Sequence, residues 1–68
     1  AMAVKNRLKA IRHDHRMNQT QFADYIGVTR SLYNRWEHQH SQPNQEWMLK
    51  LAKRLNMKVE DIFYLEDE

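Results

Sequence analysis

The stretch Asn18–His38 constrains the fold of this 68-residue chain more than any other part of it. Apolar residues recur at helical spacing on both sides of Gly27, which is the only glycine. The inward-facing set comprises Phe22, Ala23, Ile26, Val28, Tyr33 and Trp36. Asn18 and Thr29 are natural N-caps for the two runs, and Gly27 can supply a left-handed residue between them. The stretch therefore predicts two short helices joined by a tight turn.

These helices are expected at about Gln19–Ile26 and Arg30–His38. Such a turn packs two helices near a right angle, and the small Ala23 suits the place where they touch. The pattern of residues 18–38 is that of a helix-turn-helix motif, whose second helix can enter the major groove of DNA.

The second helix has a polar face opposite its apolar one. At about 100° per residue, Ser31 and Arg35 point away from the side occupied by Tyr33 and Trp36. The residues that border this face are Arg30, Asn34 and Leu32. No acid occurs from residue 28 to residue 36, and two arginines lie among the polar residues. A face that approaches phosphates and base edges is expected to have this character.

Length and composition favour one small all-helical domain over residues 1–68. The chain has one glycine, one proline and few β-branched residues, and it has no cysteine for a disulfide or a thiolate metal site. No apolar run is long enough for a membrane span or a signal sequence, so we expect a cytoplasmic protein.

Charge is distributed unevenly along the chain. The formal net charge is +2, but residues 1–58 hold all eleven Lys and Arg with four acids, and the last ten residues hold five acids and no base. A basic body with an acidic tail suggests that one surface meets a polyanion and another faces away from it.

The rest of the chain predicts three more helices. The first is expected at about Ala3–His15, with an inward stripe of Val4, Leu8 and Ile11. The fourth follows Pro43, is capped by Asn44, and ends at a left-handed Asn56. The fifth is expected at about Val59–Phe63, after which Tyr64-Leu65 extends as a strand or frays.

The order of motifs resembles a known family. The chain is similar to phage-repressor helix-turn-helix regulators of the Xre or Cro/cI type, and the likeness covers nearly the whole chain. The matching motifs are Asn6-Arg7-Leu8-Lys9-x-Ile11-Arg12, Asn18-Gln19-x-x-Phe22-Ala23, Gly27-Val28-Thr29, Tyr33-x-x-Trp36-Glu37, Pro43, Leu49-x-Leu51-Ala52-x-x-Leu55 and Val59-Glu60-Asp61-Ile62-Phe63. The resemblance implies a compact five-helix domain that binds operator DNA as a transcriptional regulator.

The resemblance also implies roles for single residues. Arg30, Ser31 and Arg35 match base-reading positions, and Arg12 and Glu37 match a buried ion pair. Positions that hold phosphate or flank the reading residues are Asn18, Gln19, Thr29, Leu32, Asn34, His38 and His40. The chain departs from the family where Gly is common, at Arg16 and at His38-Gln39, and where a Ser or Thr cap is usual, at Lys58.

Several of these roles have alternatives. Arg30 and Arg35 read guanine or contact only phosphate, and Leu32 meets a thymine methyl group or flanks the core. Trp36 and Trp47 are expected in the core, although tryptophans can also stack on bases.

The sequence supports neither a cofactor nor a small-molecule ligand. The histidines pair at spacings that diverge on a helix, as His13 with His15 and His38 with His40, so we expect no metal site. No nucleophile setting, phosphate loop or carboxylate pair indicates an enzyme.

The expected function is sequence-specific binding of double-stranded operator DNA, as a repressor and as a homodimer. The dimer contact is expected in the C-terminal region, through Ile62, Phe63 and Leu65. The alternative is a protein-interaction module, such as an antitoxin or a regulator's partner. RNA binding lacks the exposed aromatic platform expected for it.

Overall fold

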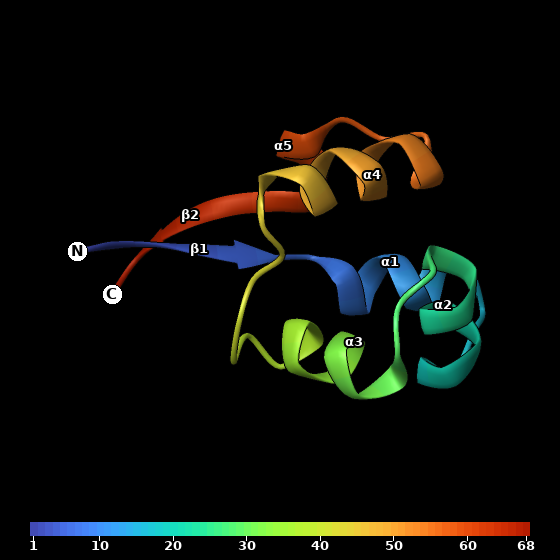
Figure 1. Cartoon of the computed structure of the whole chain (residues 1–68). Coiled ribbons are helices and arrows are strands. Elements are labelled where there is room, and N and C mark those ends of the chain that lie inside the picture. Colours follow the sequence, from blue (N-terminus) through green and yellow to red (C-terminus); the bar gives the residue numbers. More distant parts are fainter.

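The chain folds into five helices and one two-stranded sheet, as seen in a computed structural model of residues 1–68. The elements in chain order are β1 (Met2–Asn6), α1 (Leu8–Asp14), α2 (Gln19–Ile26), α3 (Arg30–Glu37), α4 (Gln45–Leu55), α5 (Val59–Ile62) and β2 (Phe63–Asp67). In Figure 1, α1 lies between α3 on one side and α4 with α5 on the other. The sheet projects from this helical body, and both chain ends lie at its tip.

Caps and a glycine fix the predicted helix-turn-helix motif. The Asn18 side chain accepts from the Gln21 N–H at 2.8 Å, and the Gln21 side chain accepts from the Asn18 N–H at 2.9 Å. This reciprocal capping satisfies two of the donors that a helix start leaves free. Thr29 caps α3 by accepting from the Leu32 N–H at 3.2 Å. Gly27 has the left-handed φ of 85° that the turn requires.

The prediction of a helix from Ala3 to His15 is wrong at its start. Residues 2–6 form β1, which pairs antiparallel with β2 so that Val4 lies opposite Leu65. Val4 is therefore 39% exposed instead of joining the core. The Asn6 side chain accepts from the Leu8 N–H at 3.0 Å, and α1 begins only there. The fold is thus a helix-turn-helix domain with a small sheet, and not strictly all-α.

The C-terminal boundary also differs slightly from the prediction. Phe63 has an extended backbone and begins β2, so α5 ends at Ile62. Tyr64-Leu65 extends as part of this strand, which is the first of the two outcomes expected for it. Asn44 caps α4 as predicted, by accepting from the Trp47 N–H at 2.9 Å, and Asn56 is left-handed with φ 54°.

A single core holds the helices together. It is formed by Leu8, Ile11, Phe22, Ala23, Ile26, Tyr33, Trp36, Leu51, Leu55, Ile62 and Phe63. Tyr33 and Trp36 are buried as predicted, and the Trp36 ring centroid lies 5.9 Å from that of Trp47. Aromatic packing here fixes the rotation of α3, and so decides which of its residues face outward. None of the helices has the length and apolar character needed to cross a bilayer.

Two departures from the family coincide with left-handed backbone. Arg16 has φ 56° and Gln39 has φ 64°, the region in which a side chain costs about 1–2 kcal/mol. At the third departure, Lys58 precedes α5 without a side-chain cap. The loops therefore keep a geometry that suits glycine, although other residues occupy it.

Candidate nucleic-acid interface

The outward face of α3 carries a shallow polar recess. Its lining comprises Arg30, Ser31, Asn34 and Arg35. Three of these side chains are exposed, and Asn34 is half-buried. The helix therefore presents together the three residues predicted to read bases. The recess has no acid and no apolar side chain in its lining, so it offers two guanidinium groups with hydroxyl and amide partners.

A second polar recess lies at the start of α2. It is lined by Arg12, Asn18, Gln19, Thr20 and Arg30. Arg30 belongs to both recesses and connects the start of α2 with the face of α3. The first turn of a helix offers free backbone N–H groups, which favour an anion such as a phosphate. Sequence reasoning did not assign Arg12 or Thr20 to this surface, although Thr20 lies in the same first turn as Gln19.

The predicted ion pair between Arg12 and Glu37 is confirmed, and its arginine also lines this recess. The Arg12 Nε donates to Glu37 Oε1 at 2.7 Å, with the two side chains 13% and 2% exposed. Arg12 also donates to the Met17 carbonyl at 3.1 Å. Tyr33 Oη donates to Glu37 Oε1 at 2.9 Å, and Gln19 Nε2 donates to Oε2 at 2.6 Å. The pair thus joins α1, α2 and α3 at one carboxylate.

These contacts fix the charges in the cluster. Burial alone would raise the pKa of Glu37, but the hydrogen bonds from Arg12, Gln19 and Tyr33 lower that pKa below its ordinary value. The hydrogen bond to Glu37 raises the pKa of Arg12. Burial, followed by the hydrogen bond to Glu37, raises the pKa of the Tyr33 phenol. At neutral pH the cluster therefore holds an ionised carboxylate, a charged guanidinium and a neutral phenol.

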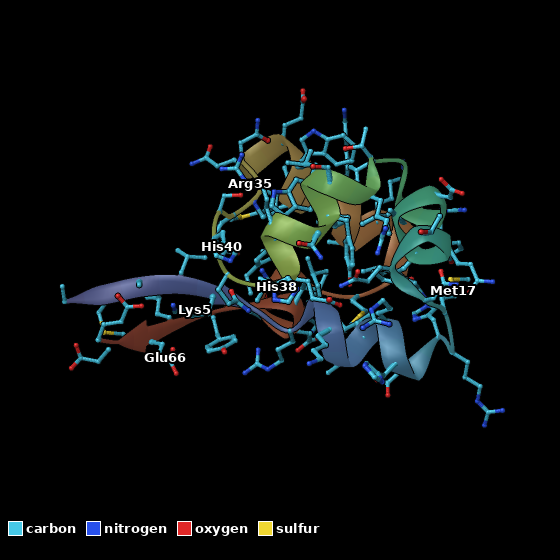
Figure 2. The ribbon with its side chains drawn as sticks, turned by 90° about the horizontal axis from the view of Figure 1, so that it is seen from below. Lys5, Met17, Arg35, His38, His40 and Glu66 are labelled. Atoms are coloured by element: carbon cyan, nitrogen blue, oxygen red, sulfur yellow. The ribbon has the colours of Figure 1, made fainter.

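Four predicted residues line neither recess, namely Thr29, Leu32, His38 and His40. Thr29, His38 and His40 are exposed, and Figure 2 shows both histidines toward the end of α3 that carries Arg35. The His38 and His40 rings lie 6.1 Å apart. No cluster of three or more His, Cys, Asp or Glu could hold a metal ion. Leu32 is half-buried and packs against the core, which favours its flanking role.

The acidic end of the chain lies apart from these recesses. Its acids belong to α5, to β2 and to the residue that follows β2. Lys5 on β1 forms an ion pair with Glu68 at 2.7 Å, and this contact raises the pKa of Lys5. Figure 2 shows Lys5 and Glu66 on the projecting sheet, away from the end of the body where Met17 lies. The fold thus places all five acids of the tail outside α3.

Comparisons with known proteins agree with this geometry. The helix-turn-helix family model matches residues 8–62. The uncharacterised transcriptional regulator YgzD of Bacillus subtilis is 34% identical over 65 residues, which cover 96% of this chain and 98% of that protein.

Two solved structures have similar folds. A proposed DNA-binding protein from Bacteroides fragilis matches with a TM-score of 0.76 and 22% identity, over 91% of this chain and all of that one. The P22 c2 repressor, solved in complex with a synthetic operator, matches with a TM-score of 0.69 and 28% identity, over 79% of this chain and 82% of that one. The chain therefore belongs to the helix-turn-helix family of transcriptional regulators, of the phage-repressor (Xre, Cro/cI-like) type.

Proposed function

We propose that this protein binds double-stranded operator DNA to regulate transcription, with α3 in the major groove. The observation that carries the proposal is the exposed, acid-free recess on the outer face of α3, which the core behind it holds in place. Membership of a family of transcriptional regulators supports it, as does the likeness to a repressor that was solved on its operator.

Within this proposal, Arg30, Ser31 and Arg35 read base edges. An arginine can pair with both acceptors of guanine, so two guanidinium groups on one face suit a site with guanine in each half. The surrounding residues hold phosphate or flank the readers, namely Asn18, Gln19, Thr29, Leu32, Asn34, His38 and His40. The recess at the start of α2 adds Arg12 and Thr20 to this phosphate-binding surface.

The regulator acts as a repressor and as a homodimer through its C-terminal region. The structure corrects the residues that can form this contact, because Ile62 and Phe63 are 0% and 7% exposed and belong to the core. Leu65 is 62% exposed, and Met2 and Val4 share its face of the sheet by register. A two-fold axis through this region would present two copies of α3 about 34 Å apart, one turn of DNA.

Selection of bound sites from random duplex DNA tests the proposal. We expect a site with two similar halves to be enriched, and a mobility shift on that site to resist an excess of random competitor DNA. Recovery of no sequence preference, with equal competition by any duplex, would contradict regulation through an operator. That result would favour the alternative function, in which the domain binds another protein.

A further inference from the structure

A chain of hydrogen bonds connects the buried ion pair with the recess on α3. Gln19 Nε2 donates to Glu37 Oε2 at 2.6 Å, and Gln19 Oε1 accepts from Asn34 Nδ2 at 3.4 Å. The other carboxylate oxygen of Glu37 accepts from Arg12 at 2.7 Å. Asn34 itself lines the recess beside the predicted reading residues. The order of contacts is therefore Arg12, Glu37, Gln19, Asn34, and the chain of contacts ends at the recess on α3.

The chemistry of these groups permits only one orientation of the two amides. An ionised carboxylate only accepts hydrogen bonds, so the end of Gln19 that faces Glu37 must be its amino group. The carbonyl of Gln19 then points at Asn34, and a carbonyl also only accepts. Asn34 must therefore present its Nδ2 to Gln19. Rotating either amide by 180° would place oxygen against oxygen or leave two amino groups facing each other.

This orientation decides what Asn34 can offer a ligand. One Nδ2 hydrogen is held by Gln19, which leaves Oδ1 as an acceptor and the second Nδ2 hydrogen as a donor. In the major groove, adenine presents a donor at N6 beside an acceptor at N7, and an asparagine amide can pair with both. Arg30 and Arg35, which share the recess, have donors only and cannot accept from N6.

We propose that Asn34 reads an adenine in each operator half-site, and that Gln19, oriented by Glu37, is the positioning residue for it. The proposal rests on the proposed function, because it names one base within the site that α3 would read. It also gives Gln19 a role in positioning Asn34 in place of a role in binding phosphate. Both ends of that amide are engaged inside the protein, so its side chain acts on Asn34, and phosphate binding at the start of α2 falls to the backbone N–H groups and Thr20.

The test uses a duplex that carries the selected site and variants of it with each base pair replaced in turn. The measured quantity is the ratio of Kd values for a replaced and an intact site. Because both values come from one protein sample, the ratio cancels any loss of folded protein. For the wild type we expect one position in each half-site where adenine is favoured roughly 5- to 150-fold over other bases.

Asn34→Ala should abolish the preference at that position and leave the other positions unchanged. Asn34→Asp offers only acceptors, so the preference there should move to cytosine, whose N4 group donates. Gln19→Ala should weaken the adenine preference at the same position. Thr20→Ala is the matched control, because Thr20 lies next to Gln19 in the same recess but outside the hydrogen-bond chain. It should weaken binding equally at all sites.

Each outcome decides one part of the proposal. If no sequence is enriched in the selection, the proposed function itself fails. If a site is enriched but its preferences all survive in Asn34→Ala, only the assignment of Asn34 is overturned. If Asn34→Ala removes the adenine preference but Gln19→Ala weakens every duplex by the same factor, Gln19 holds phosphate and does not position Asn34.

Discussion

The side-chain amide of Gln39 pairs with the backbone of Asn6 as a neighbouring strand would. Gln39 Nε2 donates to the Asn6 carbonyl at 2.9 Å, and Gln39 Oε1 accepts from the Asn6 N–H at 3.1 Å. The Asn6 side chain in turn donates to the Trp36 carbonyl at 2.8 Å. The loop after α3 is thereby fastened to the outer edge of β1, and this explains why a residue with a side chain occupies a left-handed position.

Two substitutions at Gln39 separate the contribution of its hydrogen bonds from the cost of its left-handed backbone. Gln39→Ala removes both bonds to Asn6 and keeps the left-handed backbone, so it should lower the free energy of unfolding by about 1–3 kcal/mol. Gln39→Gly removes the same bonds but also removes the steric cost of a side chain at a left-handed φ. It should therefore be about 1 kcal/mol more stable than Gln39→Ala. Urea unfolding of the three proteins measures both differences. Equal stability of wild type and Gln39→Ala would show that the amide contributes nothing to the sheet edge.

The Glu37 carboxylate should make stability depend on pH. Because its pKa is lower in the folded protein than in the unfolded chain, it stabilises the fold above the unfolded value of about 4.3, and this contribution is lost as the pH falls through the folded pKa. Glu37→Gln breaks a buried ion pair, which costs roughly 3–5 kcal/mol near neutral pH. The difference between wild type and variant should therefore shrink as the pH falls below about 4.

Thermal unfolding from pH 7 down to pH 3 measures this difference. Glu46→Gln is the control, because Glu46 pairs with Lys50 at 3.5 Å with both side chains more than half exposed. An exposed pair of this kind contributes at most about 1 kcal/mol. A difference for Glu37→Gln that stays constant across the pH range would mean that the carboxylate does not titrate differently in the folded state.

Local signals made the helix-turn-helix motif predictable from the sequence. The caps Asn18 and Thr29 and the left-handed Gly27 act within a few residues of their own positions, and Trp36 fixes the phase of α3. The same phase predicted the outward face of α3, where Ser31 and Arg35 are exposed opposite the core. Each of these inferences needed only the chain neighbours of the residue concerned.

Contacts between distant segments were not predictable in the same way. Val4 fits the spacing of a helix with Leu8 and Ile11, but its partner in the structure is Leu65, at the other end of the chain. Likewise, the bonds from Gln19 to Glu37 and Asn34 depend on how α2 crosses α3. A helical period describes one element, and it does not specify which side chains meet where two elements cross.

The exposed face of the sheet should control dimerisation. Leu65→Asp places a charge on the face that Leu65 shares with Val4, so it should weaken association without disturbing the core. Ile62→Ala removes a fully buried side chain and should cost about 2–5 kcal/mol of stability. Sedimentation equilibrium measures the weaker association expected for Leu65→Asp. Thermal unfolding measures the loss of stability expected for Ile62→Ala. A wild-type protein that is monomeric at every concentration, and that occupies a single half-site, would refute a dimer.

The last prediction concerns Arg35, which is exposed at the recess on α3. If its guanidinium reads guanine, Arg35→Ala should lose roughly 1–3 kcal/mol per half-site on the selected operator and much less on random DNA. The dependence of binding on salt should then stay nearly unchanged, because no phosphate contact is lost. Lys53→Ala is the control with the same change of charge, since Lys53 is exposed on α4, on the other side of α1 from α3 (Figure 1).

Binding isotherms on both DNAs at several salt concentrations distinguish reading from phosphate holding. Lys53→Ala should change affinity for the two DNAs by a similar small factor, because its charge acts only at a distance. A phosphate contact at Arg35 would instead give equal losses on operator and random DNA, with a salt slope flatter by about one unit for each contact removed. That result would assign Arg35 to the backbone and leave guanine recognition to Arg30, whose side chain lines both recesses.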